Sequence, residues 1–278
     1  MNPKIIFLDV DGTLIDYEQK LPSSARQAVI DARKNGHRVY ICTGCSRAEI
    51  DSKHWDFELD GMIGCDGAYV EDHGEVIMHQ RLTEEQVRHV VDWCTERGII
   101  FREECNSGMY ICDGYEEGSL QARIAYMKGK GADVPEGYRP PLPSHMISGA
   151  NMIRDDVNKF SFVLRTYQDH LDSIKEFPDL KAGTWGGVGE AALYGDLGVK
   201  NINKAHAINV LLEHLHAEAK DTIAFGDAKE DIPMFECCGY SVAMGNAGKE
   251  CKEAADYITD DINEDGLANA FRHLGLID

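Results

Sequence analysis

The sequence predicts an α/β protein built on a doubly wound parallel sheet, with an α+β domain inserted into it. At both ends of the chain, short apolar runs that end in polar loops alternate with helical patterns, which is typical of a parallel sheet. The middle of the chain loses this alternation, which resumes from Lys204. We therefore expect a discontinuous core over residues 1–81 and 190–278 and an inserted domain over residues 82–189.

The elements of the core follow from apolar runs and their boundaries. Gly36 ends the first helix, and a helical apolar face after Lys204 precedes the last group of strands. The expected elements are strands over 4–8, 39–42, 62–64, 222–225, 240–244 and 257–259, a hairpin over 68–79, and helices over 23–35, 204–215, 249–254 and from 231.

The inserted domain is expected to begin with a helix. Thr83 and Gln86 have the spacing of a capping box, and Gly98 ends the helix that they open. The expected strands cover 99–103, 109–112, 159–165 and 190–194, the further helices cover 120–127 and 168–176, and residues 129–144 form an irregular loop rich in Gly and Pro.

The charge balance limits the partners of this protein. The chain has 48 acidic and 28 basic residues, a formal net charge of −20. This charge repels nucleic acid and anionic membrane surfaces, so we expect neither as a partner. A small phosphorylated metabolite would need a site made locally positive by a metal ion, a lysine or backbone N–H groups. We expect a monomer or a small homo-oligomer.

The cysteines and the first residues indicate the compartment. The apolar run in MNPKIIFLDVDG is too short for a signal-peptide core or a membrane span. Nine cysteines scattered through the expected strands and helices fit reduced thiols better than a disulfide framework. The expected location is cytoplasmic. Cys42 and Cys45 form a C-x-x-C without a second pair, and we interpret them as ordinary thiols rather than a zinc or redox site.

Two carboxylates follow the first expected strand. The segment Asp9-Val10-Asp11-Gly12-Thr13 begins where that strand ends, at the edge where parallel sheets bind ligands. Residues two apart in extended chain point to one side, and two carboxylates there repel each other unless a cation lies between them. Carboxylate oxygens favour Mg²⁺. The glycine allows a sharp turn, which we expect to expose N–H groups that could hold phosphate.

This segment resembles the first motif of the haloacid dehalogenase superfamily. The resemblance implies that Asp9 attacks phosphorus to form an aspartyl phosphate, and that Asp11 protonates the leaving oxygen and later activates water. It also implies a Mg²⁺ ion bound by Asp9, by the backbone carbonyl of Asp11 and by a later aspartate. Gly12 and Thr13 would contact the phosphate.

The later aspartate is found after the expected strand at 222–225. Gly226, Asp227 and Asp231 resemble the fourth motif of the family, with two aspartates four residues apart. The resemblance makes Asp227 a metal ligand and Asp231 its supporting or outer partner. Relatives usually carry Asn where this chain has Glu230.

Thr43 and Gly44, at the end of the second expected strand, match the second motif, whose hydroxyl hydrogen-bonds the phosphoryl group. The family usually has Arg after the glycine, whereas this chain has Cys45, and Arg47 is the candidate replacement.

The third motif of the family is a lysine that neutralises the nucleophile and the phosphate. Lys204 fits best because it opens the helix before the Asp227 strand, and Lys200 is the alternative.

Two further segments resemble those of the Cof-like branch of the family. One is Ala243-Met244-Gly245-Asn246-Ala247, and the other surrounds Asp66, where the branch usually has Asn. This resemblance implies a Rossmann-like core with an inserted C2-type (IIB) cap, which would cover the strand ends and contact the leaving group.

The implied activity is that of a Mg²⁺-dependent phosphatase acting on small phosphate monoesters, such as sugar phosphates. Two alternatives stay open. A sugar phosphomutase uses the same residues but returns the phosphoryl group to a sugar, and a catalytically silent protein would only bind a phosphometabolite.

Overall fold

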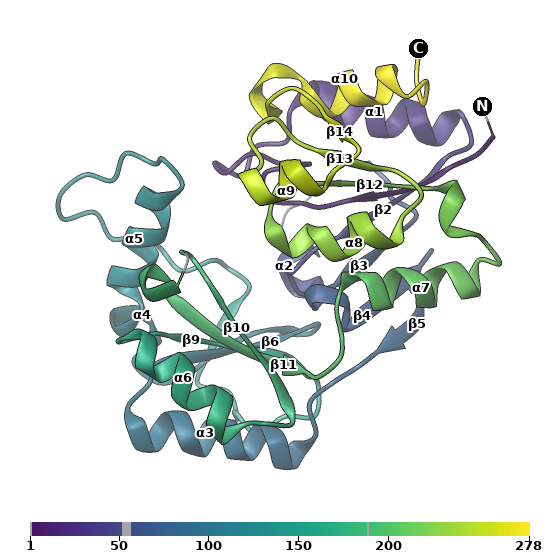
Figure 1. Ribbon diagram of the computed structural model, residues 1–278. Coiled ribbons are helices and arrows are strands. Elements are labelled where there is room, and N and C mark those ends of the chain that lie inside the picture. The colour runs from purple at the N-terminus through teal and green to yellow at the C-terminus, as the bar shows by residue number, and fades with distance from the viewer. Residues whose placement is uncertain (1, 52–56, 188) are drawn as a thin grey trace. The chain divides into compact units, whose positions relative to one another are not determined.

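The computed structural model describes residues 2–51, 57–187 and 189–278, and the chain divides into two compact units (Figure 1). The core is formed by Met1–Gly44, Trp55–His79 and Ile202–Asp278. The cap is formed by Cys45–His54 and Gln80–Asn201.

The core contains an eight-stranded sheet in the order β14-β13-β12-β1-β2-β3-β4-β5. The strands are β1 Ile5–Leu8, β2 Arg38–Cys42, β3 Gly61–Gly64, β4 Tyr69–Asp72, β5 Glu75–His79, β12 Thr222–Gly226, β13 Ser241–Ala243 and β14 Tyr257–Ile258. Neighbours from β14 through β3 pair in parallel, and β4 and β5 add an antiparallel hairpin. This confirms the predicted parallel α/β core.

Helices cover both faces of the core sheet (Figure 1). They are α1 Ser23–Lys34, α7 Lys204–His214, α8 Ile232–Cys237, α9 Lys249–Ala254 and α10 Gly266–His273, with short 3-10 turns η1 Cys65–Gly67, η3 Ala219–Asp221, η4 Lys229–Asp231 and η5 Ile262–Glu264. Buried residues of α7, α8 and α9, such as Leu211, Met234 and Cys251, pack in one cluster with Phe7 of β1. On α10, Phe271 contacts Phe225 of β12, with ring centroids 5.1 Å apart.

Among the described residues, no helix has the length and apolar character needed to cross a membrane.

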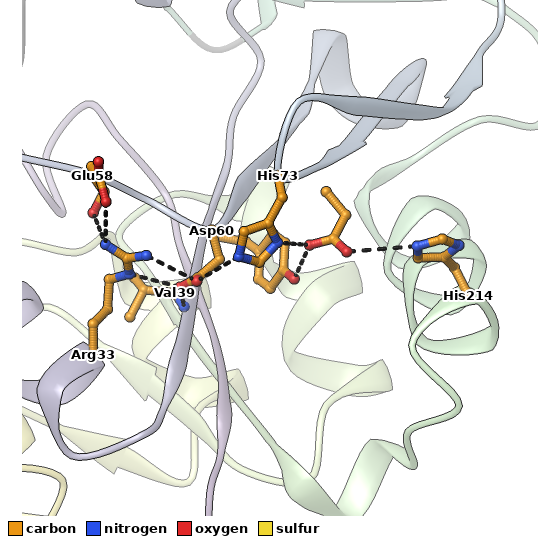
Figure 2. A network of polar contacts seen from close by, with 8 residues as sticks. Arg33, Val39, Glu58, Asp60, His73 and His214 are labelled. Carbon is orange, nitrogen blue, oxygen red and sulfur yellow. Dashed lines mark hydrogen bonds and ion pairs between the residues drawn. The ribbon is translucent and has the colours of Figure 1, made fainter.

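A network of polar contacts fastens the hairpin to the rest of the core (Figure 2). Arg33 of α1 donates to both carboxylate oxygens of Asp60, at 2.9 and 3.1 Å, and the backbone N–H of Val39 donates to the same carboxylate at 2.7 Å. His73, in the turn between β4 and β5, lies between Asp60 and Asp72, with one ring nitrogen 3.3 Å from the first and the other 2.7 Å from the second. The network thus joins α1, β2 and the hairpin.

The cap contains a six-stranded sheet in the order β10-β11-β9-β6-β7-β8, antiparallel except for the pair β7–β8. The strands are β6 Phe101–Cys105, β7 Gly108–Ile111, β8 Met146–Ser148, β9 Val157–Val163, β10 Leu180–Trp185 and β11 Tyr194–Val199. The helices are α2 Arg47–Asp51, α3 Glu84–Arg97, α4 Tyr115–Gly118, α5 Leu120–Gly129 and α6 Tyr167–Glu176, with the 3-10 turn η2 Gly189–Ala191. The capping box of Thr83 and Gln86 is confirmed, and Gly98 ends α3.

The cap extends beyond the expected residues 82–189. Residues 190–194 were expected to form a strand, but the structure has a 3-10 turn at Gly189–Ala191 followed by β11. Because β11 pairs antiparallel with β9 and β10, it belongs to the cap sheet. The segment Cys45–His54, which follows β2 in sequence, also belongs to this unit, since α2 packs against β7.

Candidate active site

Three segments that are distant in sequence end at the same edge of the core sheet. β1 pairs in parallel with both β12 and β2. Asp9 follows β1 directly, Asp227 follows β12, and Thr43 follows β2. Parallel neighbours end at one edge of a sheet, so the strand register itself brings these side chains together.

The carboxylates of Asp9, Asp227 and Asp231 form a compact cluster. Each offers one oxygen, and these oxygens lie within 4.8 Å of one another. All three residues are buried. Burial raises the pKa of Asp9 well above its usual value, the negative charges of Asp231 and Asp227 raise it further, and Lys204 works in the opposite direction.

Lys204 is the cation that the structure places in this cluster. Its Nζ donates to Asp9 Oδ1 at 2.7 Å and to Asp231 Oδ1 at 2.6 Å, and the residue is buried. Burial opposes the charged ammonium, but the attraction of Asp231 and Asp9 outweighs this effect and raises the pKa of Lys204 well above its usual value. Lys200, the alternative, is exposed in the cap and donates to the carbonyl of Pro178.

The position of Lys204 depends on the start of α7. Asn203 caps this helix, because its side-chain oxygen accepts the backbone N–H of His206 at 2.8 Å. Gly67, with φ of +102°, approaches so closely that a Cβ there would lie 2.2 Å from the carbonyl oxygen of Asn203. A glycine in the loop after β3 therefore makes room for the backbone that carries Lys204.

Asp231 closes the turn that presents Asp227. Its Oδ2 accepts the backbone N–H groups of Asp227 and Ala228, each at 3.0 Å, while its Oδ1 accepts Lys204. These contacts use both oxygens of Asp231, which fits a supporting role beside Asp227. Glu230, where relatives usually have Asn, has a side chain about half exposed, 3.7 Å from Lys229.

Two N–H groups of the loop after Asp9 are paired within the loop itself. Gly12 donates to the carbonyl of Ile15 at 2.7 Å and Thr13 donates to that of Val10 at 3.3 Å. The sharp turn at Gly12, with φ of +98°, consumes these donors in its own hydrogen bonds.

Two further side chains of this loop contact the site, and the sequence pattern did not identify them. The Tyr17 hydroxyl donates to Asp227 Oδ2, and Gln19 Nε2 donates to Asp11 Oδ1 at 2.7 Å. Burial and the neighbouring Asp227 raise the pKa of Tyr17, so its hydroxyl stays protonated and able to donate. Gly12 leaves room for the Tyr17 contact, because a Cβ there would overlap both Asp227 and Tyr17.

Of the expected phosphate-binding residues, the structure brings Thr43 and Gly44 to the core edge. Thr43 is buried, and its carbonyl accepts the N–H of Asp66 at 3.1 Å. A Cβ on Gly44 would lie 3.1 Å from the Asp66 side chain, so this glycine fits closely against the loop after β3. Arg47 instead belongs to α2 of the cap, with its Nε 3.5 Å from Asp51.

The donor set fits a divalent cation. The three clustered carboxylates and the Lys204 ammonium leave two negative charges, which one divalent cation would balance, and carboxylate oxygens suit Mg²⁺. The side chain of Asp11 is not part of this group of ligand atoms, and its Oδ1 accepts a hydrogen bond from Gln19. The expected contribution of Asp11 to metal binding is through its backbone carbonyl.

Comparison with known proteins identifies the family. The profile of the haloacid dehalogenase-like hydrolases matches residues 6–271, nearly the whole chain and all of the clustered residues. This chain belongs to that family. The predicted family, its Cof-like branch and the Rossmann-like fold with an inserted cap are thereby confirmed.

Named relatives of this hydrolase are phosphatases. It is 38% identical to a phosphoglycolate phosphatase of Methanothermobacter thermautotrophicus, over 97% of each chain. It is 26% identical to the 5-amino-6-(5-phospho-D-ribitylamino)uracil phosphatase YwtE of Bacillus subtilis, over 95% of this chain and 96% of the relative. Among solved structures, it is similar to a sugar phosphatase of haloacid dehalogenase subclass IIB, with a TM-score of 0.75 and 26% identity, covering 99% and 100% of the two chains. The hydrolase is therefore a phosphoric monoester hydrolase.

Proposed function

We propose that this hydrolase is a Mg²⁺-dependent phosphatase that transfers the phosphoryl group of small phosphate monoesters to Asp9 and then to water. The observation that carries the proposal is the buried contact of Lys204 with both Asp9 and Asp231, beside Asp227. A carboxylate nucleophile has to approach a phosphate dianion, and a buried ammonium 2.7 Å from it reduces the repulsion.

Each residue of the cluster has a separate task in the proposed reaction. Asp9 attacks phosphorus and becomes the aspartyl phosphate, while the ester oxygen leaves. Asp227 and Asp9 would hold Mg²⁺ together with the carbonyl of Asp11, and when bound there it would offset the charge of the phosphoryl group. Asp231 orients Asp227 and Lys204 through its hydrogen bonds.

The side chain of Asp11 acts as acid and base in this proposal. It gives a proton to the leaving oxygen in the first half-reaction and takes one from water in the second. Gln19 Nε2, 2.7 Å from its Oδ1, keeps the carboxyl oriented. Thr43 contributes a hydroxyl to the phosphoryl group at the end of β2, and Gly44 allows the close approach of the loop at Asp66.

For the substrate we propose a small phosphorylated metabolite, with sugar phosphates as the first class to test. The support comes from the names of similar proteins. Two relatives are named as phosphatases of phosphoglycolate and of a phosphorylated ribityl compound, and a structural neighbour is named as a sugar phosphatase. We assign the choice among substrates to the cap, because phosphoryl transfer itself is assigned to the core residues.

A panel of phosphorylated metabolites tests this function. Each compound is incubated with the protein and Mg²⁺, and released phosphate and remaining ester are both measured. We expect free phosphate from a subset of the panel, with no release by Asp9→Asn. An isomerised phosphate ester with little free phosphate would show a mutase, and binding without turnover by the wild-type protein would show a silent binding protein.

A further inference from the structure

Tyr17 lies beside the proposed metal site, although it belongs to none of the family motifs described above. It follows the turn at Gly12, and its hydroxyl donates to Asp227 Oδ2. The chain therefore adds a neutral hydrogen-bond donor to one oxygen of a proposed metal ligand.

The position of the Tyr17 hydroxyl is fixed by its surroundings. Asn246, in the loop after β13, faces the Tyr17 hydroxyl and lowers its pKa, against the larger effects of burial and Asp227. The same Asn246 donates to the carbonyl of Gly12 at 2.8 Å and accepts the backbone N–H of Ile262 at 3.0 Å. The missing side chain of Gly12 provides the space, because a Cβ there would lie 2.7 Å from the Tyr17 oxygen. Asn246, itself held by Gly12 and Ile262, and the space at Gly12 thus define where the hydroxyl that donates to Asp227 lies.

This contact limits how Asp227 can coordinate a cation. When Oδ2 of a carboxylate accepts a hydrogen bond from a hydroxyl, only Oδ1 keeps all its lone pairs for a metal ion. Mg²⁺ is small and requires a near-ideal octahedron, whereas Ca²⁺ takes six to eight oxygens and commonly binds both oxygens of a carboxylate. A carboxylate held to one oxygen therefore favours Mg²⁺ over Ca²⁺.

We propose that Tyr17 is a positioning residue that holds Asp227 in one-oxygen geometry and so makes the site select Mg²⁺ against Ca²⁺. The proposal rests on the proposed function, in which Asp227 is a metal ligand. It concerns the selectivity of the site and not the transfer of the phosphoryl group.

Metal affinity measured by isothermal titration calorimetry tests the proposal without relying on turnover. Mg²⁺ and Ca²⁺ are titrated separately into metal-free wild-type protein and into Tyr17→Phe, which removes only the hydroxyl. Partners that orient a metal ligand typically contribute about 10- to 100-fold in affinity. We expect the Kd for Mg²⁺ to rise by about tenfold, the low end of that range, and the Kd for Ca²⁺ to rise less or to fall.

Tyr40→Phe is the matched control. Tyr40 also donates its hydroxyl to a carboxylate, Asp72 at 2.6 Å, but this pair lies in the hairpin network of the core. We expect the ratio of the two Kd values in Tyr40→Phe to equal that of the wild-type protein. Metal-free melting temperatures of the variants check that both are folded.

The outcomes separate this proposal from the proposed function. If the wild-type protein binds Mg²⁺ in a manner that Asp227→Asn abolishes, and Tyr17→Phe leaves the Ca²⁺/Mg²⁺ ratio of Kd values unchanged, the role of Tyr17 is wrong and the metal site stands. If the wild-type protein shows no Mg²⁺ binding that depends on Asp227, the metal site and the role of Tyr17 are both wrong.

Discussion

Lys204 Nζ and Asp9 Oδ1 lie 2.7 Å apart, although 195 residues separate them in sequence. The contact is buried and is shared with Asp231, whose Oδ1 lies 2.6 Å from the same nitrogen. Breaking a buried ion pair by removing one partner leaves an uncompensated charge, so this lysine should matter for both the stability and the chemistry of the site.

Lys204→Ala should lower kcat by about 100-fold or more, the effect of removing one preorganised electrostatic contact from a dry site. Initial rates on the best substrate of the metabolite panel measure this effect. Lys200→Ala is the matched control and should keep the wild-type rate, because Lys200 is exposed in the cap. A large loss in Lys200→Ala with little loss in Lys204→Ala would move the third motif to Lys200.

Phosphate release should stop when the protein is treated with EDTA and should return when excess Mg²⁺ is added. Without a cation, Asp9, Asp227 and Asp231 leave two negative charges next to Lys204, and a phosphate dianion is repelled. The measurement is the rate of phosphate release before chelation, after it and after Mg²⁺ addition. Full activity in chelator would show that the metal assignment is wrong.

Gly67→Ala should lower kcat because the new Cβ would displace Asn203 and with it Lys204. Gly74→Ala is the control, since Gly74 also has a positive φ, +83°, but nothing lies within 4 Å of a Cβ there. Both variants should lose about 1 kcal/mol or more of stability from the left-handed backbone. Equal kcat values in the two variants would contradict the role of Gly67 in placing Lys204.

Glu103 of the cap should make stability depend on pH. Both carboxyl oxygens are buried without a hydrogen-bond partner among the described residues. Burial raises the pKa of Glu103 to about 8, with Arg154 lowering it and Asp156 raising it. The folded state therefore keeps a proton that the unfolded state releases above its usual pKa of 4.5, so stability is lost as the pH rises from about 4.5 to about 8.

Glu103→Gln removes this proton linkage while keeping the shape of the side chain. Urea unfolding followed by tryptophan fluorescence, to which Trp93 and Trp185 of the cap contribute, gives the free energy of unfolding at pH 5, 7 and 9. The wild-type value minus the variant value should fall from pH 5 to pH 7 and fall further, by less, from pH 7 to pH 9. A difference that is constant over this range would contradict the buried, protonated state of Glu103.

Much of the fold could be predicted from the sequence because its signals are local. Asp9 and Thr43 each follow an apolar run that ends at a polar residue, which marks the end of a buried parallel strand. The start of α3 could be predicted because the capping box at Thr83 is also a local signal, formed by residues three apart in sequence. The strand β11, Tyr194–Val199, was expected a few residues too early, at 190–194, because a short apolar run does not show where pairing with β9 and β10 begins.

The candidate site was harder to predict where contacts are long-range. Choosing Lys204 over Lys200 required the resemblance to a family, since a lysine at a helix start is usually solvated. Tyr17 and Gln19 carry no periodic or motif signal, and their contacts arise from the path of the chain after Gly12. The sequence also does not show that the amides of Gly12 and Thr13 are bonded within the turn, because those contacts depend on the folded path of the loop.

Covalent catalysis by Asp9 is the central claim, and a trapping experiment with Asp11→Asn tests it most directly. The asparagine lacks the acid and base function, so an activated phosphate ester should still phosphorylate Asp9 while hydrolysis of the aspartyl phosphate becomes slow. After rapid acid quenching, peptide mass spectrometry should find one added phosphoryl group on the peptide that contains Asp9, and none in Asp9→Asn treated in the same way. An Asp9→Asn variant that keeps near-wild-type turnover, or a phosphoryl group found on another residue of Asp11→Asn, would contradict the nucleophilic role of Asp9.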